Sequence, residues 1–356
     1  MKEQTGASVA ELGVALVFIS VAALPAMLLA GRVSDRLGPR AVAPALALFA
    51  ATLALPGLAH SVPQLALALV AVGAASGALD VAINVAATAV EASGTRIMQL
   101  AHALFSAGFL VAAVTVGLAR EAGAEPLPVL LAAVVVVLAA GALNRGYPVP
   151  TGPIVARRLV VSRRLLLLGA LCAVAFVVEG GIENWSALFL ERTLEASPAV
   201  SGLGPGLFAT AMVAGRLLGQ ALDVRLGDRY LLAAGAGLAA SGLVLAAGAP
   251  TVPLALLGLF LGGAGISVAA PTLFGAAGRN APNSERGSAV ASVTTISYLG
   301  FLAGPPLIGV VSGALGLRAG FGVLAAISAL LAVAAASLGG ALPLRRLQHP
   351  ARRKLS

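Results

Sequence analysis

The hydrophilic segment at residues 31–40 reads GRVSDRLGPR and separates two long apolar runs. The run before it, residues 9–30, is long enough to cross a hydrocarbon core of roughly 30 Å. Arginines concentrated in a short loop mark the cytoplasmic side of a membrane, because positive charge in such loops resists translocation. The segment therefore predicts a tight cytoplasmic turn between two membrane-spanning helices. Taken alone, it fits a charged hairpin without further function equally well.

The composition indicates a protein that crosses the membrane many times. Of the 356 residues, 59% are hydrophobic and 10% are charged, whereas soluble domains carry about 25% charged residues. The net charge of +9 does not predict a nucleic-acid partner, because the basic residues stand singly or in pairs between apolar runs. Cys172 is the one cysteine, so an internal disulfide is excluded, and we expect no metal or other cofactor. The expected surroundings are the lipid bilayer.

Apolar runs between charged residues, prolines and glycines predict eleven membrane spans. They lie at residues 9–31, 41–60, 64–91, 98–119, 126–143, 164–190, 199–222, 230–248, 252–278, 287–313 and 319–341. If the loop at 32–40 is cytoplasmic, the regions on that side hold 18 of the 23 lysines and arginines, and the opposite side holds 4. This bias predicts a bacterial-type inner-membrane protein with the N-terminus outside and the C-terminus in the cytoplasm.

The chain contains a second, weaker copy of the opening segment. Residues 219–229 read GQALDVRLGDR, so that a glycine again precedes an aspartate by four residues. Asp35 and Asp223 are 188 residues apart, and the loops around Arg96 and Arg286 are 190 apart. Two features at nearly one offset indicate an internal duplication. We therefore predict a helical bundle at 1–143, a basic cytoplasmic linker at 144–163, a second bundle at 164–341 and a basic cytoplasmic tail at 342–356.

These features together resemble the major facilitator superfamily. The resemblance rests on GRVSDRLGPR, its copy, the basic linker and the duplication, and it covers essentially the whole chain. GALDVAINVAATAVE at 77–91 and HALFSAG at 102–108 resemble a bacterial subgroup of uncharacterised or sugar-permease-like members. The resemblance implies an all-α, polytopic, two-bundle transporter, which we expect to be a monomer. In such a transporter the two copies would latch the cytoplasmic side closed through Gly31, Asp35, Arg36, Gly38, Arg40, Gly219, Asp223, Arg225 and Gly227.

The sequence departs from this family at its start. Members usually have twelve spans, two of them before the signature loop, whereas one span precedes Gly31 here. The resemblance thus predicts that the counterpart of the first helix is missing, through a start site assigned too far downstream or in a real shortened product. An inactive truncated transporter, or a non-transporting membrane sensor or assembly protein, is accordingly the alternative to a working transporter.

Strongly polar side chains inside the predicted spans are few, and their burial is costly enough to favour a functional role. Asp80 and Asn84 are one helical turn apart and share a helix face, and Glu179 and Glu183 repeat this spacing. By the resemblance, the helices that carry these pairs both line the central cavity. The candidates for binding the substrate or a proton are Asp80, Asn84, His102, Glu179, Glu183, Asn184, Trp185 and Arg216.

The carboxylates suit proton binding that depends on which side the cavity faces, and His102 suits proton relay. The asparagines would hydrogen-bond a polar solute, and Trp185 would offer a flat apolar wall. Arg216 would either pair with a carboxylate or an anion, or extend toward the cytoplasmic interface. The alternative for all of these groups is that they satisfy one another or free backbone carbonyls between helices.

The sequence has no phosphate-binding loop of the form G-x-x-x-x-G-K-[ST], so ATP-driven transport by this chain is not expected. It also has no metal motif or Ser/His/Asp set that would indicate an enzyme. We therefore predict a secondary transporter that moves a small polar solute by alternating access, coupled to protons.

Overall fold

A computed structural model of the chain describes residues 2–92, 98–143, 162–279, 281 and 286–337. Nearly all of these residues are helical, and this part of the chain contains no strand. For some helical residues the backbone is described but the side chain is not. Among the predicted site residues, these are Asp35, His102, Asp223 and Arg225.

The described residues of the first half of the chain form six helices. They are α1 (Lys2–Thr5), α2 (Val9–Leu37), α3 (Val42–Leu53), α4 (Val62–Ala92), α5 (Met98–Glu121) and α6 (Pro126–Leu143). Two short 3₁₀ turns, η1 (Gly38–Ala41) and η2 (Leu55–Leu58), connect α2 to α3 and α3 to α4.

The described residues of the second half also form six helices. They are α7 (Arg163–Thr193), α8 (Pro198–Gly248), α9 (Val252–Ile266), α10 (Ala269–Arg279), α11 (Arg286–Leu315) and α12 (Leu317–Ser337). The long α8 is two spans, because Gly227 has φ 73° and ψ 162° and interrupts the helical backbone. Glycine adopts such a positive φ without steric cost. Conversely, α9 and α10 together form one span, Val252–Arg279.

The observed helices confirm ten of the predicted spans. Within the described residues, ten stretches are long and apolar enough to cross a membrane, and α5 forms a helix over the remaining predicted span at 98–119. Large apolar side chains such as Leu67 and Leu330 are exposed on the isolated chain, by 72% and 69%. A surface of this kind is what a bilayer requires of the helices it surrounds.

The opening segment forms a shorter turn than its hydrophilic length suggests. A capping box starts α2: the Ser8 hydroxyl accepts from the Glu11 amide, and the Glu11 carboxylate accepts from the Ser8 amide. The helix then continues through Arg36 to Leu37 and ends at Gly38, which has a positive φ of 56°. Most of the arginine-rich segment is therefore the last helical turns of α2, and the chain reverses at Gly38 and η1.

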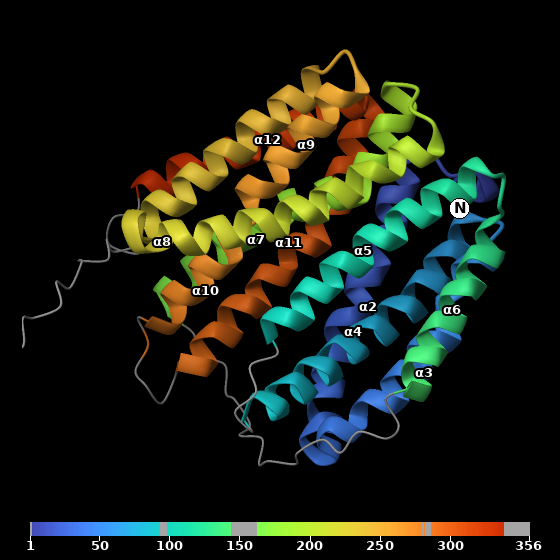
Figure 1. Cartoon of the computed structure of the whole chain (residues 1–356), viewed down its shortest axis with the longest axis horizontal. Helices are drawn as coiled ribbons and strands as arrows, with labels where there is room; N and C mark the ends of the chain where they lie inside the picture. Colours follow the sequence, from blue (N-terminus) through green and yellow to red (C-terminus); the bar gives the residue numbers. More distant parts are fainter. Residues whose placement is uncertain (1, 93–97, 144–161, 280, 282–285, 338–356) are drawn as a thin grey trace, which may run out of the picture.

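The helices form two groups that lie side by side (Figure 1). Within the first group, α4 packs on α2 and α3, and α3 packs on α6; within the second, α8 packs on α9 and α12, and α7 on α11. The groups meet through two helix pairs, α2 with α11 and α5 with α8. We call the two groups the first and second bundle.

We call the two ends of the molecule the linker end and the distal end. The linker end is where α6 ends at Leu143 and α7 begins at Arg163. The distal end is the opposite one, where α2 begins, α5 ends and α7 ends (Figure 1).

Candidate functional site

A carboxylate and a guanidinium meet in the second bundle. Glu179 lies near the middle of α7, and its Oε1 is 4.0 Å from Nη2 of Arg216 on α8. The Glu179 side chain is largely buried, whereas that of Arg216 is partly exposed. Nε of Arg216 is buried without a hydrogen-bond partner in the described part of the chain. At 4.0 Å the two charges attract each other without a direct hydrogen bond, so the pair is loose.

Glu183 lies one turn further along α7 and is half-buried. Within the described residues it forms no hydrogen bond and no ion pair, and its charge acts on Glu179. Arg216 therefore offsets the charge of Glu179, and Glu183 gains no such cation within the described residues. A buried carboxylate without a partner is costly, so this group has an unmet need for a proton or another positive charge.

The first bundle contributes Asp80 and Asn84 on α4. The Asn84 amide donates to Oδ1 of Asp80 at 3.1 Å and to the Asp80 backbone oxygen at 2.9 Å. Asp80 and Glu179 both act electrostatically on the hydroxyl of Tyr298 on α11. Because Tyr298 belongs to the second bundle, Asp80 lies on the side of α4 that faces this bundle. The structure therefore brings Asp80, Glu179 and Tyr298 toward one region between the bundles.

Tyr298 is a member of this group that the sequence analysis missed. It forms an aromatic cluster with Phe176 and Phe301, with ring centroids 6.4 Å and 6.1 Å from its own, and Phe176 lies one turn before Glu179 on α7. A signal was available, since the chain has three tyrosines and this one falls within a predicted span. A tyrosine inside a span carries a hydroxyl that requires a partner.

Asn184 and Trp185 follow Glu183 on α7 but lie elsewhere. The Asn184 amide donates to the backbone oxygen of Gly180 at 2.8 Å, and its side chain lines a cavity at the distal end. Trp185 is fully buried. It packs against Gly13 of α2 and Gly309 of α11, so in this conformation its ring does not line a cavity.

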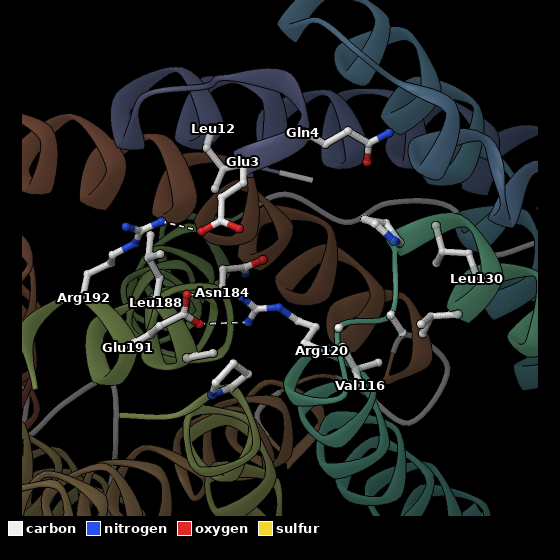
Figure 2. A pocket seen from close by; sticks show the side chains of 16 residues that line it. Glu3, Gln4, Leu12, Val116, Arg120, Leu130, Asn184, Leu188, Glu191 and Arg192 are labelled. Carbon is white, nitrogen blue, oxygen red and sulfur yellow. Dashed lines mark hydrogen bonds and ion pairs between the residues drawn. The ribbon is translucent and has the colours of Figure 1, made fainter. Parts of the chain in front are cut away.

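The distal cavity has a volume of about 740 Å³ and lies between the ends of α2, α5, α6 and α7 (Figure 2). The two guanidinium groups on its wall are both in ion pairs. Arg120 of α5 holds both carboxylate oxygens of Glu191 of α7, at 2.9 Å and 3.1 Å. Arg192 of α7 pairs with Glu3 of α1 at 2.8 Å. Both pairs join the first bundle to the second.

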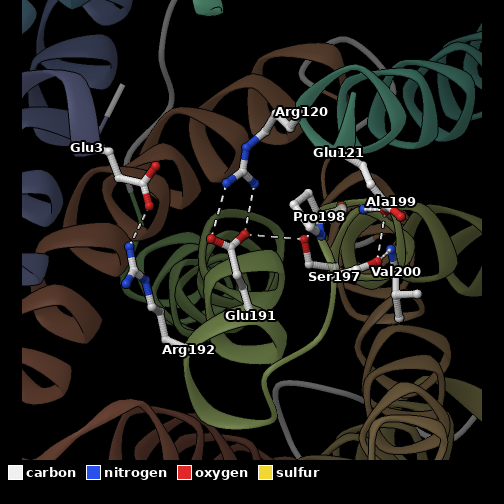
Figure 3. Close-up of polar contacts among 10 residues, drawn as sticks. Glu3, Arg120, Glu121, Glu191, Arg192, Ser197, Pro198, Ala199 and Val200 are labelled. Carbon is white, nitrogen blue, oxygen red and sulfur yellow. Dashed lines mark hydrogen bonds and ion pairs between the residues drawn. The ribbon is translucent and has the colours of Figure 1, made fainter. Parts of the chain in front are cut away.

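A third polar contact joins the bundles at the same end (Figure 3). The Glu121 carboxylate at the end of α5 accepts from the Ser197 hydroxyl and from the Ala199 amide, both at 2.9 Å. Ser197 and Ala199 form the start of α8, where unpaired backbone amides favour a negative charge. We call these three contacts, Arg120–Glu191, Arg192–Glu3 and Glu121 with the start of α8, the distal clamp.

The predicted latch lies at the linker end. The side chains of Asp35, Asp223 and Arg225 lie outside the described residues, as does that of His102. The described side chains of Arg36 and Arg40 are exposed, and Gly219 is so close to α9–α10 that a Cβ there would lie 2.6 Å from Val268 Cγ1. Whether the two copies latch the bundles together therefore stays a prediction.

The second copy holds a different ion pair. Asp228, the residue after Gly227, is nearly buried, and Nη2 of Arg279 at the end of α10 lies 2.6 Å from its Oδ1. The sequence analysis singled out Asp223 and missed Asp228. The Gly-Asp-Arg sequence at the end of the copy could have indicated Asp228, because this aspartate directly follows the glycine at which the helix is interrupted. The pair joins two helices of the second bundle.

In the described part of the chain, no group of three or more His, Cys, Asp or Glu side chains is placed to hold a metal ion. The two-bundle arrangement and its intramembrane carboxylates can be set beside known proteins. The family model described as Major Facilitator Superfamily matches residues 1–222 and 184–355.

The chain belongs to the major facilitator superfamily. An uncharacterized transporter of this type from Yersinia pestis is 38% identical over 345 residues, which cover 94% of this chain and 88% of that protein. The membrane protein MosC of Rhizobium meliloti is 32% identical over 333 residues, covering 91% of this chain and 81% of MosC. The resemblance stated from the sequence is thereby confirmed, and the chain is a multi-pass membrane protein of a transporter family.

Solved structures agree with the major facilitator fold. A variant of the nucleoside transporter NupG matches with a TM-score of 0.79 at 16% identity, covering 94% of this chain and 92% of that one. A variant of the fucose:proton symporter FucP of E. coli matches with a TM-score of 0.55 at 19% identity, covering 92% and 96%. At these identities the likeness confirms the fold alone.

Proposed function

We propose that this chain is a secondary active transporter that moves a small polar solute by alternating access, driven by a proton gradient. The observation that carries the proposal is the group Glu179, Glu183 and Arg216, in which two carboxylates lie one turn apart inside a membrane span and one of them, Glu179, faces a guanidinium at 4.0 Å. Ionisable groups at such positions mark ion and proton pathways in membrane proteins. The two solved neighbours are a nucleoside transporter and a fucose:proton symporter, which supports a small polar solute.

The loose Glu179–Arg216 pair supplies a mechanism for coupling. When Glu179 is ionised, it attracts the guanidinium of Arg216 across 4.0 Å. A proton on Glu179 removes this attraction and frees the guanidinium, which has five N–H donors, for oxygen atoms of a solute. Proton binding would thus prepare the site for the solute, and loss of the proton would return Arg216 to Glu179 and favour release.

Asp80 of the first bundle and Glu179 of the second both act electrostatically on Tyr298, in the region between the bundles. Asp80, Glu179 and Glu183 outnumber Arg216 among the described charges of this group, so we expect a neutral or cationic solute to bind better than an anion. The Asn84 amide, held by Asp80, and the Tyr298 hydroxyl are suited to hydrogen bonding with such a solute. The aromatic cluster of Phe176, Tyr298 and Phe301 offers an apolar face beside these groups.

Alternating access is supported by where the bundles touch. The distal clamp and the contact of Gly13 with Gly309 all lie at the distal ends of their helices. With the linker end in the cytoplasm, as the arginine and lysine bias predicts, this conformation is closed toward the outside. We accordingly propose a monomer in the inner membrane, with bundles at 1–143 and 164–341 that rock about the Glu179 group and a latch at Asp35 and Asp223 that closes the linker end in the opposite state.

The test is uptake by proteoliposomes that contain the purified chain. A panel of neutral sugars, nucleosides, amines and organic anions is offered with and without a pH gradient that favours proton entry. We expect at least one neutral or cationic solute to accumulate, and the gradient to be required. In Glu179→Gln we expect gradient-driven accumulation to be lost while exchange of labelled for unlabelled solute continues.

The matched control is Glu125→Gln, which alters an exposed glutamate in the α5–α6 connection. Accumulation that persists in Glu179→Gln, Glu183→Gln and Asp80→Asn alike would refute proton coupling through this group. Absence of transport for every solute in the panel would instead favour the alternative of a non-transporting membrane protein.

A further inference from the structure

Trp185 is the one tryptophan of the chain, and it lies at the contact between the bundles. A Cβ added to Gly13 of α2 would lie 3.2 Å from Cζ2 of the indole, and one added to Gly309 of α11 would lie 3.1 Å from the same atom. Either Cβ would also lie 2.8 Å from the Cα of the other glycine. The indole of α7 therefore covers the point where a helix of the first bundle touches a helix of the second.

The indole N–H has no partner at this contact. Trp185 is 0% exposed, and its Nε1 forms no hydrogen bond within the described part of the chain. A buried donor without an acceptor is costly, and a tryptophan N–H usually finds a partner when it is buried. Packing against the two glycines favours the buried position, whereas the unpaired N–H favours contact with water or a solute. The packing contacts and the unpaired N–H therefore oppose each other, so the indole is suited to move between a buried and an exposed position.

The contacts around Trp185 lie close to the other contacts between the bundles. Glu191 of the distal clamp is on the same helix, between one and two turns beyond Trp185. On the other side of the interface, a Cβ on Gly202 of α8 would lie 2.7 Å from the backbone oxygen of Ala113 on α5. Separation of the bundles at the distal end would break the clamp and draw Gly13 away from Gly309, which uncovers the indole.

We propose that Trp185 is a gate residue. Its indole seals the α2–α11 contact while the distal side is closed, and it lines the solute pathway, with its N–H available to water or solute, when that side is open. The inference rests on the alternating access of the proposed function. It requires neither the proton coupling nor the identity of the solute.

The fluorescence of the single native tryptophan tests this without labels or substrate. The full chain is placed in lipid nanodiscs, and acrylamide quenching and the emission maximum are recorded with excitation selective for tryptophan. Gly13→Ala and Gly309→Ala each place a methyl group against backbone atoms, so the distal contact cannot close as it does in the unaltered chain. The control is Gly322→Ala on α12, where a Cβ would meet no atom within 4 Å.

We call Gly13→Ala and Gly309→Ala the wedge variants. We expect each of them to favour the open distal contact, to raise the quenching constant about twofold or more and to move the emission maximum to longer wavelength. Gly322→Ala should match the unaltered chain. Quenching and emission that equal the control in both wedge variants, with circular dichroism and monodisperse elution intact, would show that Trp185 is a static packing residue and overturn the proposal.

A charge exchange in the distal clamp covers the case in which the wedge variants do not fold. Glu191→Arg alone sets like charges against Arg120 and should raise the quenching, whereas Glu191→Arg combined with Arg120→Glu should restore the original value. Equal quenching in the single and the double variant would contradict the gate. If tryptophan exposure shifts but no solute is transported, the proposed function fails while the opening of the distal contact at Trp185 stands; if transport occurs without any shift, the gate fails alone.

Discussion

The ion pair between Asp228 and Arg279 permits a quantitative test of the second bundle. We replace each residue with one that carries a neutral amide, in Asp228→Asn and Arg279→Gln, and combine the two in a double-mutant cycle. The Asp228 side chain is 8% exposed and that of Arg279 is 44% exposed. A hydrogen bond to a charged group contributes about 1.5–3 kcal/mol, and the exposure of the guanidinium lowers this through solvent screening. We therefore expect a coupling energy of about 1–2 kcal/mol.

The measurement is thermal unfolding of the purified chain in a mild detergent. For a domain of about 150–250 residues, 1 kcal/mol corresponds to roughly 2–4 °C, so Asp228→Asn should lower Tm by a few degrees. Arg279→Gln should have a similar effect, because it leaves a nearly buried carboxylate without its cation. Once one partner is gone, changing the second should cost little. A double variant whose loss in Tm equals the sum of the two single losses would refute the pairing, and Glu125→Gln should leave Tm unchanged.

Further predictions concern the transport group and the distal clamp. Arg216→Gln removes the cation beside Glu179, and we expect solute affinity to fall and the pH at which uptake is half-maximal to shift; an unchanged pH profile in proteoliposomes would argue against coupling between the two. Tyr298→Phe keeps the aromatic packing and removes the hydroxyl, so thermal stability should stay the same while solute affinity falls, as measured by radioligand binding. Ser197→Ala removes the side-chain cap of α8 and one donor to Glu121, and should destabilise the protein by about 0.5–2 kcal/mol, visible as a lower Tm.

The positions of the spans were predictable because the bilayer fixes their length. An apolar run must cover the hydrocarbon core whatever the rest of the protein does, so hydropathy located the ten spans found among the described residues. The break in α8 was also predictable, since Gly227 stands in a hydrophilic segment. What the sequence did not contain is the rotation of each helix about its own axis. That rotation follows from packing between helices.

The candidate site illustrates this limit. Glu179 and Arg216 are both unusual residues within spans, yet their contact depends on which faces of α7 and α8 meet. The environment of Trp185 could not be predicted either. It is set by contact with Gly13 and Gly309, which lie in opposite bundles and near opposite ends of the chain. Asp228 was missed for a different reason: the sequence reasoning followed the aspartate that matches Asp35 and overlooked the one fixed by the helix break.

The partial exposure of the distal clamp makes its ion pairs sensitive to the salt in the surrounding medium. The side chains of Arg120 and Arg192 are 40% and 47% exposed, so dissolved ions reach both pairs. Raising the ionic strength from 0.01 M to 1 M shortens the Debye length from about 30 Å to about 3 Å, which weakens attraction between exposed charges. High salt should therefore loosen the contact between the bundles at the distal end, and low salt should hold it closed. The ionic strength of the medium would then set how often the distal end opens.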